Sequence, residues 1–366
     1  MNKIWGALLV TLALAAYCVF WPVPIEPIAW NAPTAPGYRG AHATNTRLLG
    51  LQDIALNGEI GPEHVLLGPD GKLYAGVESG RILRMQADGS AQEVFSDTKG
   101  RPLGMAFDSH GALIVADALK GLLSIASDGK VTVLATAVAG TVMGFVDAVV
   151  VAKSGKIYFT DASMRFSPAQ WGSTLEAATL DVLEQAATGR VLEYDPTTKA
   201  VRVVARGLSF ANGIALSGNE QSLIVCESGR YRLWKIAIGA DQHDVAIPSA
   251  QAAVFFDNLP GYPDNLMRGL DGKIWLGFGG ARNDLDAMAQ WPSLRRLVLR
   301  IPRVLWSQPK PYGHVMAFTD DGKVVADLQD PSGKSTLTTG ATETQERLYL
   351  QNANGRGLGW IARSNL

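Results

Sequence analysis

Cysteine and unbalanced charge are both scarce in this chain of 366 residues. It has two cysteines: Cys18 lies in an apolar run at the N-terminus and Cys226 in a strand-like Leu-Ile-Val-Cys segment. This pair argues against a disulfide framework. The 33 basic and 34 acidic residues leave a formal net charge of -1. A chain so evenly balanced has no basic footprint for nucleic acid, so a nucleic-acid partner is not expected.

Charge is also missing from residues 4–21, which follow the positive flank of Lys3. An apolar run of this length is typical of a signal anchor or a signal peptide, so residues 1–21 are assigned to one of these. We favour the anchor, because the apolar run continues past a possible cleavage site at residues 13–15. Lys3 would stay on the cytoplasmic side, which places the body on the periplasmic or lumenal side. The alternative is secretion after signal cleavage.

Residues 22–47 contain five prolines and are predicted to form an extended spacer. Proline at this density is incompatible with a helix interior or a central strand. The remaining residues, 48–366, are predicted to form the folded body. The chain is long enough for two or three ordinary domains, but a closed array of repeats of this size can be a single domain.

The body repeats one strand-turn-strand pattern, in which a turn precedes a short apolar strand. The aligned blocks are Gly71-Lys72-Leu73-Tyr74, Gly111-Ala112-Leu113-Ile114, Gly155-Lys156-Ile157-Tyr158, Gln221-Ser222-Leu223-Ile224, Gly272-Lys273-Ile274-Trp275 and Glu346-Arg347-Leu348-Tyr349. Six such units predict an all-β, six-bladed β-propeller. Segments 315–319 and 324–328 are assigned to the sixth blade, whose final strand comes from either residues 357–361 or the chain near Leu48.

Two insertions interrupt the repeats, at about residues 166–187 and 282–310. The first has a composition compatible with a helix. The second contains residues 288–306, which are apolar and basic without a single acid. Pro292 and Pro302 limit any helix to the stretch between them. This segment could lie on a membrane surface, cover a pocket, or pack on the propeller with solvated arginines.

An oxygen-bearing side chain recurs ten or eleven residues before the apolar strand of the repeat. The equivalent positions in the six units are Glu63, Leu103, Asp147, Asn212, Asp264 and Thr338. Equivalent positions on the inner strands of a propeller face one axial channel. Three carboxylates there would repel one another unless a cation joined them, and carboxylate and amide oxygens are the ligands that calcium prefers. Alternatively, these are ordinary polar residues of turns and strand starts.

Several motifs resemble those of strictosidine synthase-like proteins, most closely the branch that includes adipocyte plasma membrane-associated protein. They are Gly-Pro-Glu at 61–63, Gly-Arg-Pro-Leu-Gly at 100–104, Val-Ala-Asp-Ala-Leu-Lys-Gly-Leu at 115–122, Lys-Ile-Tyr-Phe-Thr-Asp-Ala-Ser at 156–163, Phe-Ala-Asn-Gly at 210–213 and Leu-Pro-Gly-Tyr-Pro-Asp-Asn at 259–265. The likeness covers about residues 48–350. It implies the wider superfamily of gluconolactonases and paraoxonases, whose hydrolases are six-bladed propellers with a catalytic calcium in the axial channel.

The resemblance implies that Glu63, Asn212 and Asp264 bind calcium, with Asn265 as a neighbour that adds its amide. Asp147 replaces the asparagine usual in the family, and Ala148 replaces the following acid. Ala148 removes a residue associated with a second, structural calcium in paraoxonases, so one calcium is predicted. Leu103 stands where paraoxonases have a histidine for lactone hydrolysis, so that base is absent. For the metal-independent glutamate of the alkaloid-forming relative, Glu343 is the candidate.

These inferences together predict a calcium-dependent hydrolase of small-molecule esters or lactones. Asp264 is predicted to be catalytic as nucleophile or base, with Glu63, Asp147, Asn212, Asp264 and Asn265 as the metal-binding set. Two alternatives remain open: a non-catalytic, membrane-tethered binding propeller and a strictosidine synthase-like condensing enzyme. Among the histidines, His314 is the one considered for a pocket.

Overall fold

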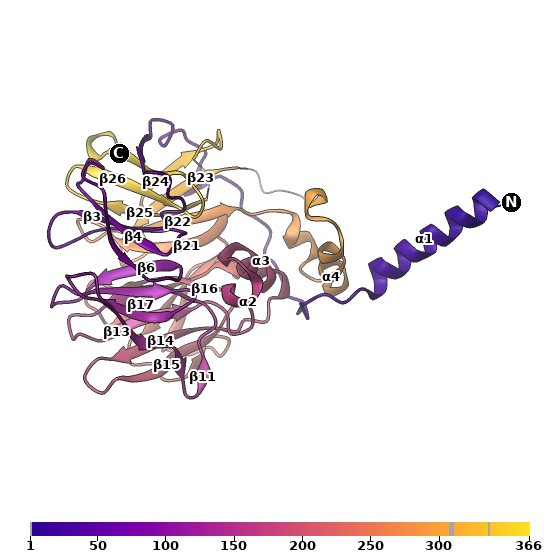
Figure 1. The fold of residues 1–366 in the computed structure, drawn as a ribbon, viewed down its shortest axis with the longest axis horizontal. Helices are drawn as coiled ribbons and strands as arrows, with labels where there is room; N and C mark the ends of the chain where they lie inside the picture. The colour runs from indigo at the N-terminus through magenta and orange to yellow at the C-terminus, as the bar shows by residue number, and fades with distance from the viewer. Residues whose placement is uncertain (1, 307–310, 336) are drawn as a thin grey trace.

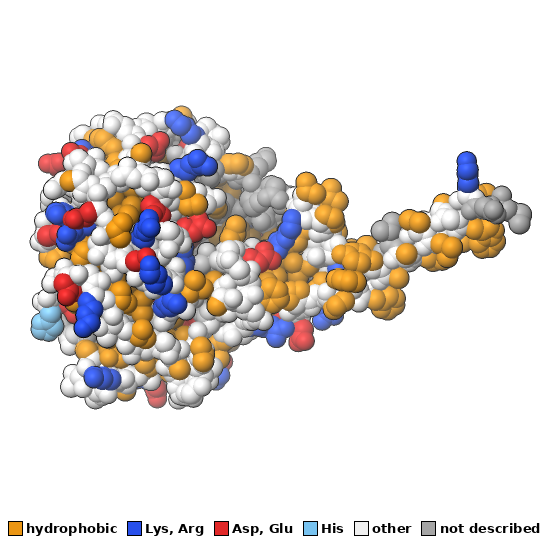
Figure 2. Space-filling view, viewed as in Figure 1, with side chains coloured by type: hydrophobic (Ala, Val, Ile, Leu, Met, Phe, Trp, Pro, Cys, Tyr) orange, Lys and Arg blue, Asp and Glu red, His pale blue; other side chains and the backbone are white. Residues whose placement is uncertain are grey.

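A computed structural model describes residues 2–306, 311–335 and 337–366 of the chain. Helix α1, Asn2–Phe20, projects away from a body built mainly of strands (Figure 1). By length and composition, its residues 3–20 could cross a membrane, with a mean hydropathy of 1.9 and no burial against the body. Hydrophobic side chains follow α1 to its junction with the body (Figure 2).

The body is a β-propeller, and four of its blades are separate sheets that are antiparallel except where β19 joins blade three. Blade one contains β2 (His64–Leu67), β3 (Leu73–Gly76), β4 (Arg81–Met85) and β5 (Glu93–Asp97). Blade two contains β6 (Pro102–Phe107), β7 (Leu113–Asp117), β8 (Gly121–Ile125) and β9 (Val131–Ala135). Blade three contains β12 (Val146–Val151), β13 (Ile157–Asp161), β14 (Gly189–Asp195) and β15 (Ala200–Leu208), with β19 (His243–Asp244) parallel to β15. Blade four contains β16 (Ala211–Leu216), β17 (Ser222–Glu227), β18 (Arg232–Ala237) and β20 (Ala252–Phe256).

The last two blades join into one larger sheet through a single residue pair, Phe278 with Thr338. Blade five contains β21 (Gly261–Arg268), β22 (Ile274–Ala281), β23 (Gly313–Phe318) and β24 (Val324–Asp330). Blade six contains β25 (Thr338–Glu343), β26 (Arg347–Asn352), β27 (Gly357–Ala362) and, from the other end of the body, β1 (Gln52–Ala55). The described residues therefore form six blades, as the repeats predicted.

One sequence assignment was wrong: β23 and β24 belong to the fifth blade. The reason is that the insertion of about 30 residues separates β22 from β23 in the sequence, although these strands pair directly, Leu276 with Met316. Both candidates for closing the sixth blade are used, since β27 is its third strand and β1 its outermost strand. The ring is thus closed by pairing of strands from the two ends of the body.

The core consists of apolar clusters between neighbouring blades, because each blade has two faces that must be covered. Between blades one and two, for example, Tyr74, Ile82, Met105 and Val115 pack together. A small hairpin, β10 (Ala137–Val138) with β11 (Thr141–Val142), lies before β12. These packed faces fix the rotation of each blade and so the direction of its inner strand.

The two insertions contain the helices of the body. The first forms α2 (Pro168–Trp171) and α3 (Thr174–Glu184), each with a serine N-cap. The second forms η3 (Asp284–Met288), α4 (Pro292–Arg300) and η4 (Arg303–Leu305), while its residues 307–310 lie outside the described residues. Short 3-10 helices also occur as η1 (Gly40–His42), η2 (Ser228–Arg230) and η5 (Arg363–Asn365).

Residues 22–47 contain no strand and run along the body rather than away from it. Ile25 is buried, and the backbone N–H groups of Ile28 and Trp30 donate to the carbonyls of Glu184 and Ala289. Each inserted segment is thus hydrogen-bonded to this N-terminal stretch.

Candidate functional site

The six inner strands contact one another in a closed ring, in the order β2, β6, β12, β16, β21, β25 and back to β2. Each of the six positions singled out in the sequence lies at or near the start of one of these strands. Glu63 comes directly before β2, and Asp147, Asn212 and Asp264 lie within β12, β16 and β21. The structure therefore brings Glu63, Asp147, Asn212 and Asp264, of which successive ones are 52 to 84 positions apart in the sequence, to one end of one channel.

A break in strand register accompanies this end of the inner strands. Pairing shifts between Val146 and Val149 in β12, between Ala211 and Ile214 in β16, and between Pro263 and Leu266 in β21. Bulges of this kind bend a strand and re-aim its side chains. Asp147, Asn212 and Asp264 each fall inside one of these shifts, which turns them out of the regular alternation.

Glycine directly after the equivalent position, at Gly104 and Gly213, allows neighbouring inner strands to approach closely. A Cβ atom on Gly213 would lie 2.3 Å from the carbonyl oxygen of Asp264 and 2.6 Å from the nitrogen of Leu266. A Cβ atom on Gly104 would lie 2.6 Å from the Cα of Ala148. These positions require glycine because backbone atoms, rather than movable side chains, occupy the space.

Glu63 has a cationic neighbour that the sequence reasoning missed. The Arg101 guanidinium lies 3.4 Å from Glu63 Oε2 and also donates to the Gly61 carbonyl at 3.0 Å. Burial raises the pKa of Glu63, while Arg101 acts in the opposite direction. Arg101 lies two residues before Leu103 in a strand-start motif. No spacing rule distinguishes it from a surface arginine, so only the fold reveals its role.

The other two carboxyl groups have no cation of their own among the described residues. Burial, and then the charge of Glu63, raises the pKa of Asp147 well above its ordinary range. The pKa of Asp264 is also raised well above its ordinary range by burial, and further by Glu63 and Asp147. Asp147 is 5% exposed, whereas Asp264 is half-buried and retains contact with solvent. The site thus has more acidic than basic groups in a poorly solvated place.

The amides of the site have different surroundings. The Asn212 Oδ1 oxygen is buried and has no hydrogen-bond partner, and hydrogen bonding between Asn212 and Asp264 lowers the pKa of Asp264. Asn265 donates from Nδ2 to the backbone carbonyl of Glu63 at 3.3 Å, which joins β21 to the start of β2. Asn212 therefore presents a free oxygen to the channel, while the nitrogen of Asn265 is engaged across it.

The remaining two equivalent positions do not offer a free oxygen. Leu103 is buried with Phe145 and Phe210 in a cluster that also includes Leu180 of α3. The Thr338 hydroxyl is 2.9 Å from both the N–H and the carbonyl of His314 and 3.2 Å from the carbonyl of Phe278. Thr338 thus hydrogen-bonds blade six to blade five.

Cys226 is a further residue near the site that sequence reasoning did not connect with it. It lies on β17, fully buried, and its thiol pKa is raised well above the ordinary value by burial and then by Asp264 and Asp147. The thiol is therefore close to both carboxyl groups. Its position in a strand-like run gave no signal beyond burial.

The inserted helices cover the same end of the propeller. Leu103, Phe145 and Phe210, all near inner-strand starts, pack with Leu180 and Leu183 of α3. Figure 1 shows α2, α3 and α4 on the side of the body from which α1 extends. The helices form a roof over the end of the channel that holds the candidate ligands, and we refer to α2, α3 and α4 as the roof helices.

A buried arginine fastens this roof. Arg295 of α4 is 2% exposed and donates to the carbonyls of Leu183 at 2.8 Å, Ile28 at 2.5 Å and Ala289 at 3.1 Å. Arg300 donates to the carbonyls of Trp21 at 2.7 Å and Cys18 at 2.9 Å at the end of α1. The basic residues of the second insertion therefore include two that bind backbone carbonyls, rather than only solvated ones.

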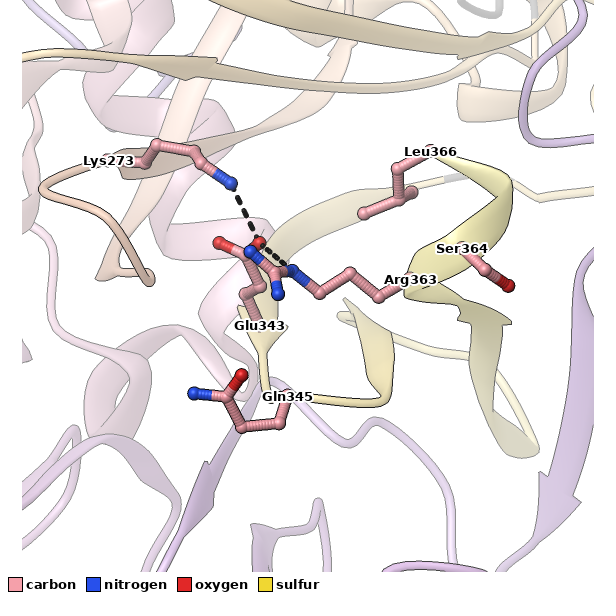
Figure 3. Close-up of a pocket in the computed structure, with 6 residues that line it drawn as sticks. All are labelled: Lys273, Glu343, Gln345, Arg363, Ser364 and Leu366. Carbon is pink, nitrogen blue, oxygen red and sulfur yellow. Dashed lines mark hydrogen bonds and ion pairs between the residues drawn. The ribbon is translucent and has the colours of Figure 1, made fainter.

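Glu343 lies far from the channel mouth, in a pocket of about 390 Å³ near the C-terminus (Figure 3). It accepts hydrogen bonds from Lys273 at 2.9 Å, Arg363 at 3.0 Å and Trp275 at 3.0 Å. Burial opposes ionisation of Glu343, but these partners outweigh it and lower its pKa. Glu343 lies five residues after Thr338 on β25, which corresponds to roughly 16 Å along the strand. It therefore does not face the axial carboxylates.

Comparisons with known proteins place this propeller in a family. Family models described as strictosidine synthase and as the N-terminal part of strictosidine synthase-like proteins match residues 147–240 and 40–85. A strictosidine synthase-like protein of Arabidopsis thaliana, numbered 7, is 34% identical over 88% of this chain and 85% of its own length. Adipocyte plasma membrane-associated protein of Salmo salar is 30% identical over 95% of this chain and 88% of its own.

The class defined by the fold is the six-bladed propeller of the gluconolactonase and regucalcin type. A gluconolactonase from Xanthomonas campestris superposes with a TM-score of 0.59 at 20% identity, covering 93% of this chain and 98% of that chain. Regucalcin from Agrobacterium tumefaciens, a calcium-binding protein, superposes with a TM-score of 0.57 at 14% identity, covering 85% and 93%. Within that class, the chain belongs to the strictosidine synthase-like family.

Proposed function

We propose that this protein is a calcium-dependent hydrolase of small-molecule esters or lactones. The observation that carries the proposal is the convergence of Glu63, Asp147, Asn212 and Asp264 at one roofed end of the channel. The neighbours include a gluconolactonase and a calcium-binding regucalcin, which is consistent with this chemistry.

The donor set suits one hard divalent cation. Three carboxylates and one arginine leave a formal charge of -2 when all four groups are ionised. Burial raises the pKa of Asp147 and Asp264, so the pair is unfavourable without a positive charge. The unpartnered Asn212 Oδ1 adds a neutral oxygen, and calcium accepts six to eight such ligands including water. We therefore propose Glu63, Asp147, Asn212 and Asp264 as ligands, with Asn265 positioning the Glu63 backbone.

A bound calcium ion would supply the Lewis acidity that polarises a substrate carbonyl. Asp264 is the candidate nucleophile or general base, because it is less buried than Asp147 and, unlike Glu63, has no arginine partner. The Arg101 guanidinium neutralises Glu63, which limits the repulsion that ionised Asp264 experiences. The roof helices restrict access of bulk water to this end of the channel.

We also propose that α1 anchors the protein in a membrane, with the propeller on the periplasmic or lumenal side. The apolar length of α1 and the membrane-associated names of several relatives support anchoring. The short cytoplasmic flank with Lys3 supports this orientation. Protease added to sealed inverted membrane vesicles should leave the propeller intact and should digest it once detergent opens them. Digestion without detergent would contradict the orientation, and a soluble mature protein would indicate signal cleavage.

The enzymatic proposal is tested by assaying aryl esters and lactones with the full chain in detergent. We expect turnover that requires calcium, disappears on addition of EGTA, and falls by about 100-fold or more in Asp264→Asn. Glu93→Gln is the matched control, because Glu93 lies on the outer strand β5 and is largely exposed. Its activity should equal that of the wild type.

A wild-type protein that binds calcium but hydrolyses none of these substrates would instead support a non-catalytic binding propeller. Condensation of an amine with an aldehyde in the presence of EGTA would support the strictosidine synthase-like alternative. The position of Glu343 away from the channel mouth argues against its use in that reaction here.

A further inference from the structure

A second group of potential metal ligands lies on the outer side of blade five. It comprises His42 from η1, His314 from β23 and Asp327 from β24. One ligand atom from each lies within 4.8 Å of the other two, and this is the one such group of His, Cys, Asp or Glu side chains in the described residues. The ligand atoms of the axial carboxylates do not all lie within 4.8 Å of one another. The family resemblance drew no attention to His42 or Asp327.

The three side chains meet at one carboxylate oxygen. Asp327 Oδ2 lies 2.8 Å from His42 Nδ1 and 2.9 Å from His314 Nε2. His314 is 1% exposed, and His42 is the most accessible of the three. Two imidazoles and a carboxylate are a ligand set that zinc uses in proteins, with a fourth position for water or another oxygen.

Surrounding side chains hold this carboxylate in place. The other oxygen, Asp327 Oδ1, accepts hydrogen bonds from Gln329 and from Asn45, the latter at 3.5 Å. Gln329 in turn accepts from the Tyr312 hydroxyl at 2.7 Å. Asp327 and Gln329 lie two positions apart on β24 and so share a face. Hydrogen bonds of this kind orient metal ligands and are part of functional metal sites.

An aromatic shell encloses the buried histidine. The ring of Phe278 stacks on His314 with centroids 4.2 Å apart, and Tyr38 meets its edge at 5.5 Å. The Tyr38 hydroxyl is buried and has no hydrogen-bond partner, and the same is true of His314 Nδ1. The structure thus combines a fixed ligand set with a buried, unsatisfied oxygen next to it.

We propose that His42, His314 and Asp327 form a zinc site that fastens the N-terminal segment to the fifth blade. In a tetrahedral site, ligand atoms stand about 3.3 Å apart, so each of the two present contacts must open by about 0.5 Å. Zinc binds neutral imidazoles, so on binding His42 Nδ1 and His314 Nε2 must be the unprotonated nitrogens, with the ring proton on the other nitrogen of each imidazole. The site is separate from the axial channel and does not depend on the proposed hydrolase activity.

Zinc binding would attach residues 39–48 more firmly to blade five. These residues already contact β24: Asn45 bonds to Asp327 and Gln329, and the N–H of Leu48 donates to the Gln329 carbonyl at 3.1 Å. They lead directly into β1, which closes the ring. A metal joining His42 to β23 and β24 therefore stabilises the segment that delivers the closing strand.

The test is zinc binding by the full chain in detergent after removal of metals with a chelator. We expect one zinc ion per chain with a dissociation constant below about 1 µM, and with Co²⁺ as probe an intense tetrahedral absorption band. His42→Ala should weaken zinc binding by 100-fold or more and abolish the band. Zinc should slow amide exchange of residues 39–48 in the wild type but not in this variant.

Two matched variants separate this site from others. His110→Ala removes an exposed turn histidine and should leave zinc binding unchanged. Glu63→Gln alters the axial channel and should also leave it unchanged. Because His42 is partly exposed, His42→Ala is expected to fold, which circular dichroism checks. Absence of zinc binding in the wild type, or binding that His42→Ala does not weaken, would show a hydrogen-bonded triad without metal and overturn the proposal.

Discussion

The acidic side chains at the channel mouth account for both the pH dependence of stability and the proposed chemistry of the site. Three carboxyl groups lie near one another with one arginine, and burial is the main cause that raises the pKa of Asp147 and Asp264. A carboxyl group whose pKa is higher in the folded than in the unfolded state stabilises the fold at low pH. That contribution is lost as pH rises from about 4 through the raised folded value.

We therefore predict that, in EGTA, Asp147→Asn is more stable than the wild type and that its advantage grows as the pH rises from about 4. At pH 8 the gain should be about 1–3 kcal/mol, because a buried like charge is removed. With saturating calcium the wild type should be the more stable protein, because the ion then neutralises the carboxylates in place of protons. Thermal unfolding of both proteins between pH 4.5 and 8 measures this.

The wild type and Asp147→Asn must be compared, because buried histidines change the free energy of unfolding with pH in the direction opposite to that of the buried carboxyl groups. Burial lowers the pKa of His64 to about 4, so protonation of the unfolded state destabilises the fold below about pH 6.5. Both proteins share this effect, and it cancels in their difference. A difference that does not change with pH would contradict the assignment of Asp147 to the charged cluster.

The sequence identified site residues only where they occupy equivalent positions in the repeated units. Glu63, Asp147, Asn212 and Asp264 could be found because they occupy one phase of the repeat. Arg101 and Cys226 could not, because their proximity to the carboxyl groups comes from strand geometry and has no sequence period. Metal binding by the four residues is still a prediction.

At the scale of strands and helices, close approach between inner strands is the principal constraint. Gly213→Ala should destabilise the protein by about 1–3 kcal/mol, because the added Cβ would meet the backbone of Asp264 and Leu266. Calcium affinity should fall with it, since the same contact displaces Asp264. Gly239→Ala is the control: it has nothing within 4 Å, and it should change stability by less than about 0.5 kcal/mol. Equal effects of the two substitutions would contradict this packing argument.

The roof depends on one side chain of α4. Arg295→Ala should cost about 1–3 kcal/mol, because the carbonyls of Leu183, Ile28 and Ala289 lose a buried donor. It should also speed proteolysis within residues 282–306. Arg296→Ala, one position along on the exposed face, should do neither. Unchanged proteolysis of Arg295→Ala would mean that other contacts hold the roof.

Strand positions were predictable because turn residues and apolar alternation recur in phase, and the helix limits were predictable from Pro292 and Pro302. The assignment of β23 and β24 was not, because an insertion between paired strands hides their pairing from any local pattern. The burial of Arg295 was equally hidden, since two of its three carbonyl partners, Leu183 and Ile28, lie far away in the sequence.

For the whole molecule, ring closure by β1 is the decisive connection. A chain that begins at residue 22 should unfold close to the temperature of the full chain, because α1 is not buried against the body and the described residues removed include only two hydrogen-bond partners of the body, the Arg300 acceptors Cys18 and Trp21. A chain that begins at residue 58 should lose at least about 3–6 kcal/mol, since Ile54 and Leu56 are buried and β1 completes blade six. Calorimetry of both chains measures this, and equal stability would refute a closing role for β1.

The central claim is that four of the six inner strands bring Glu63, Asp147, Asn212 and Asp264 together as one calcium site. Elemental analysis and calorimetric titration of the purified full chain test it most directly, beside Glu63→Gln and Asp264→Asn. We predict one calcium ion per wild-type chain and at least a tenfold weaker affinity in each variant. A wild-type protein that takes up no calcium at millimolar concentration, or variants that bind it equally well, would contradict the account.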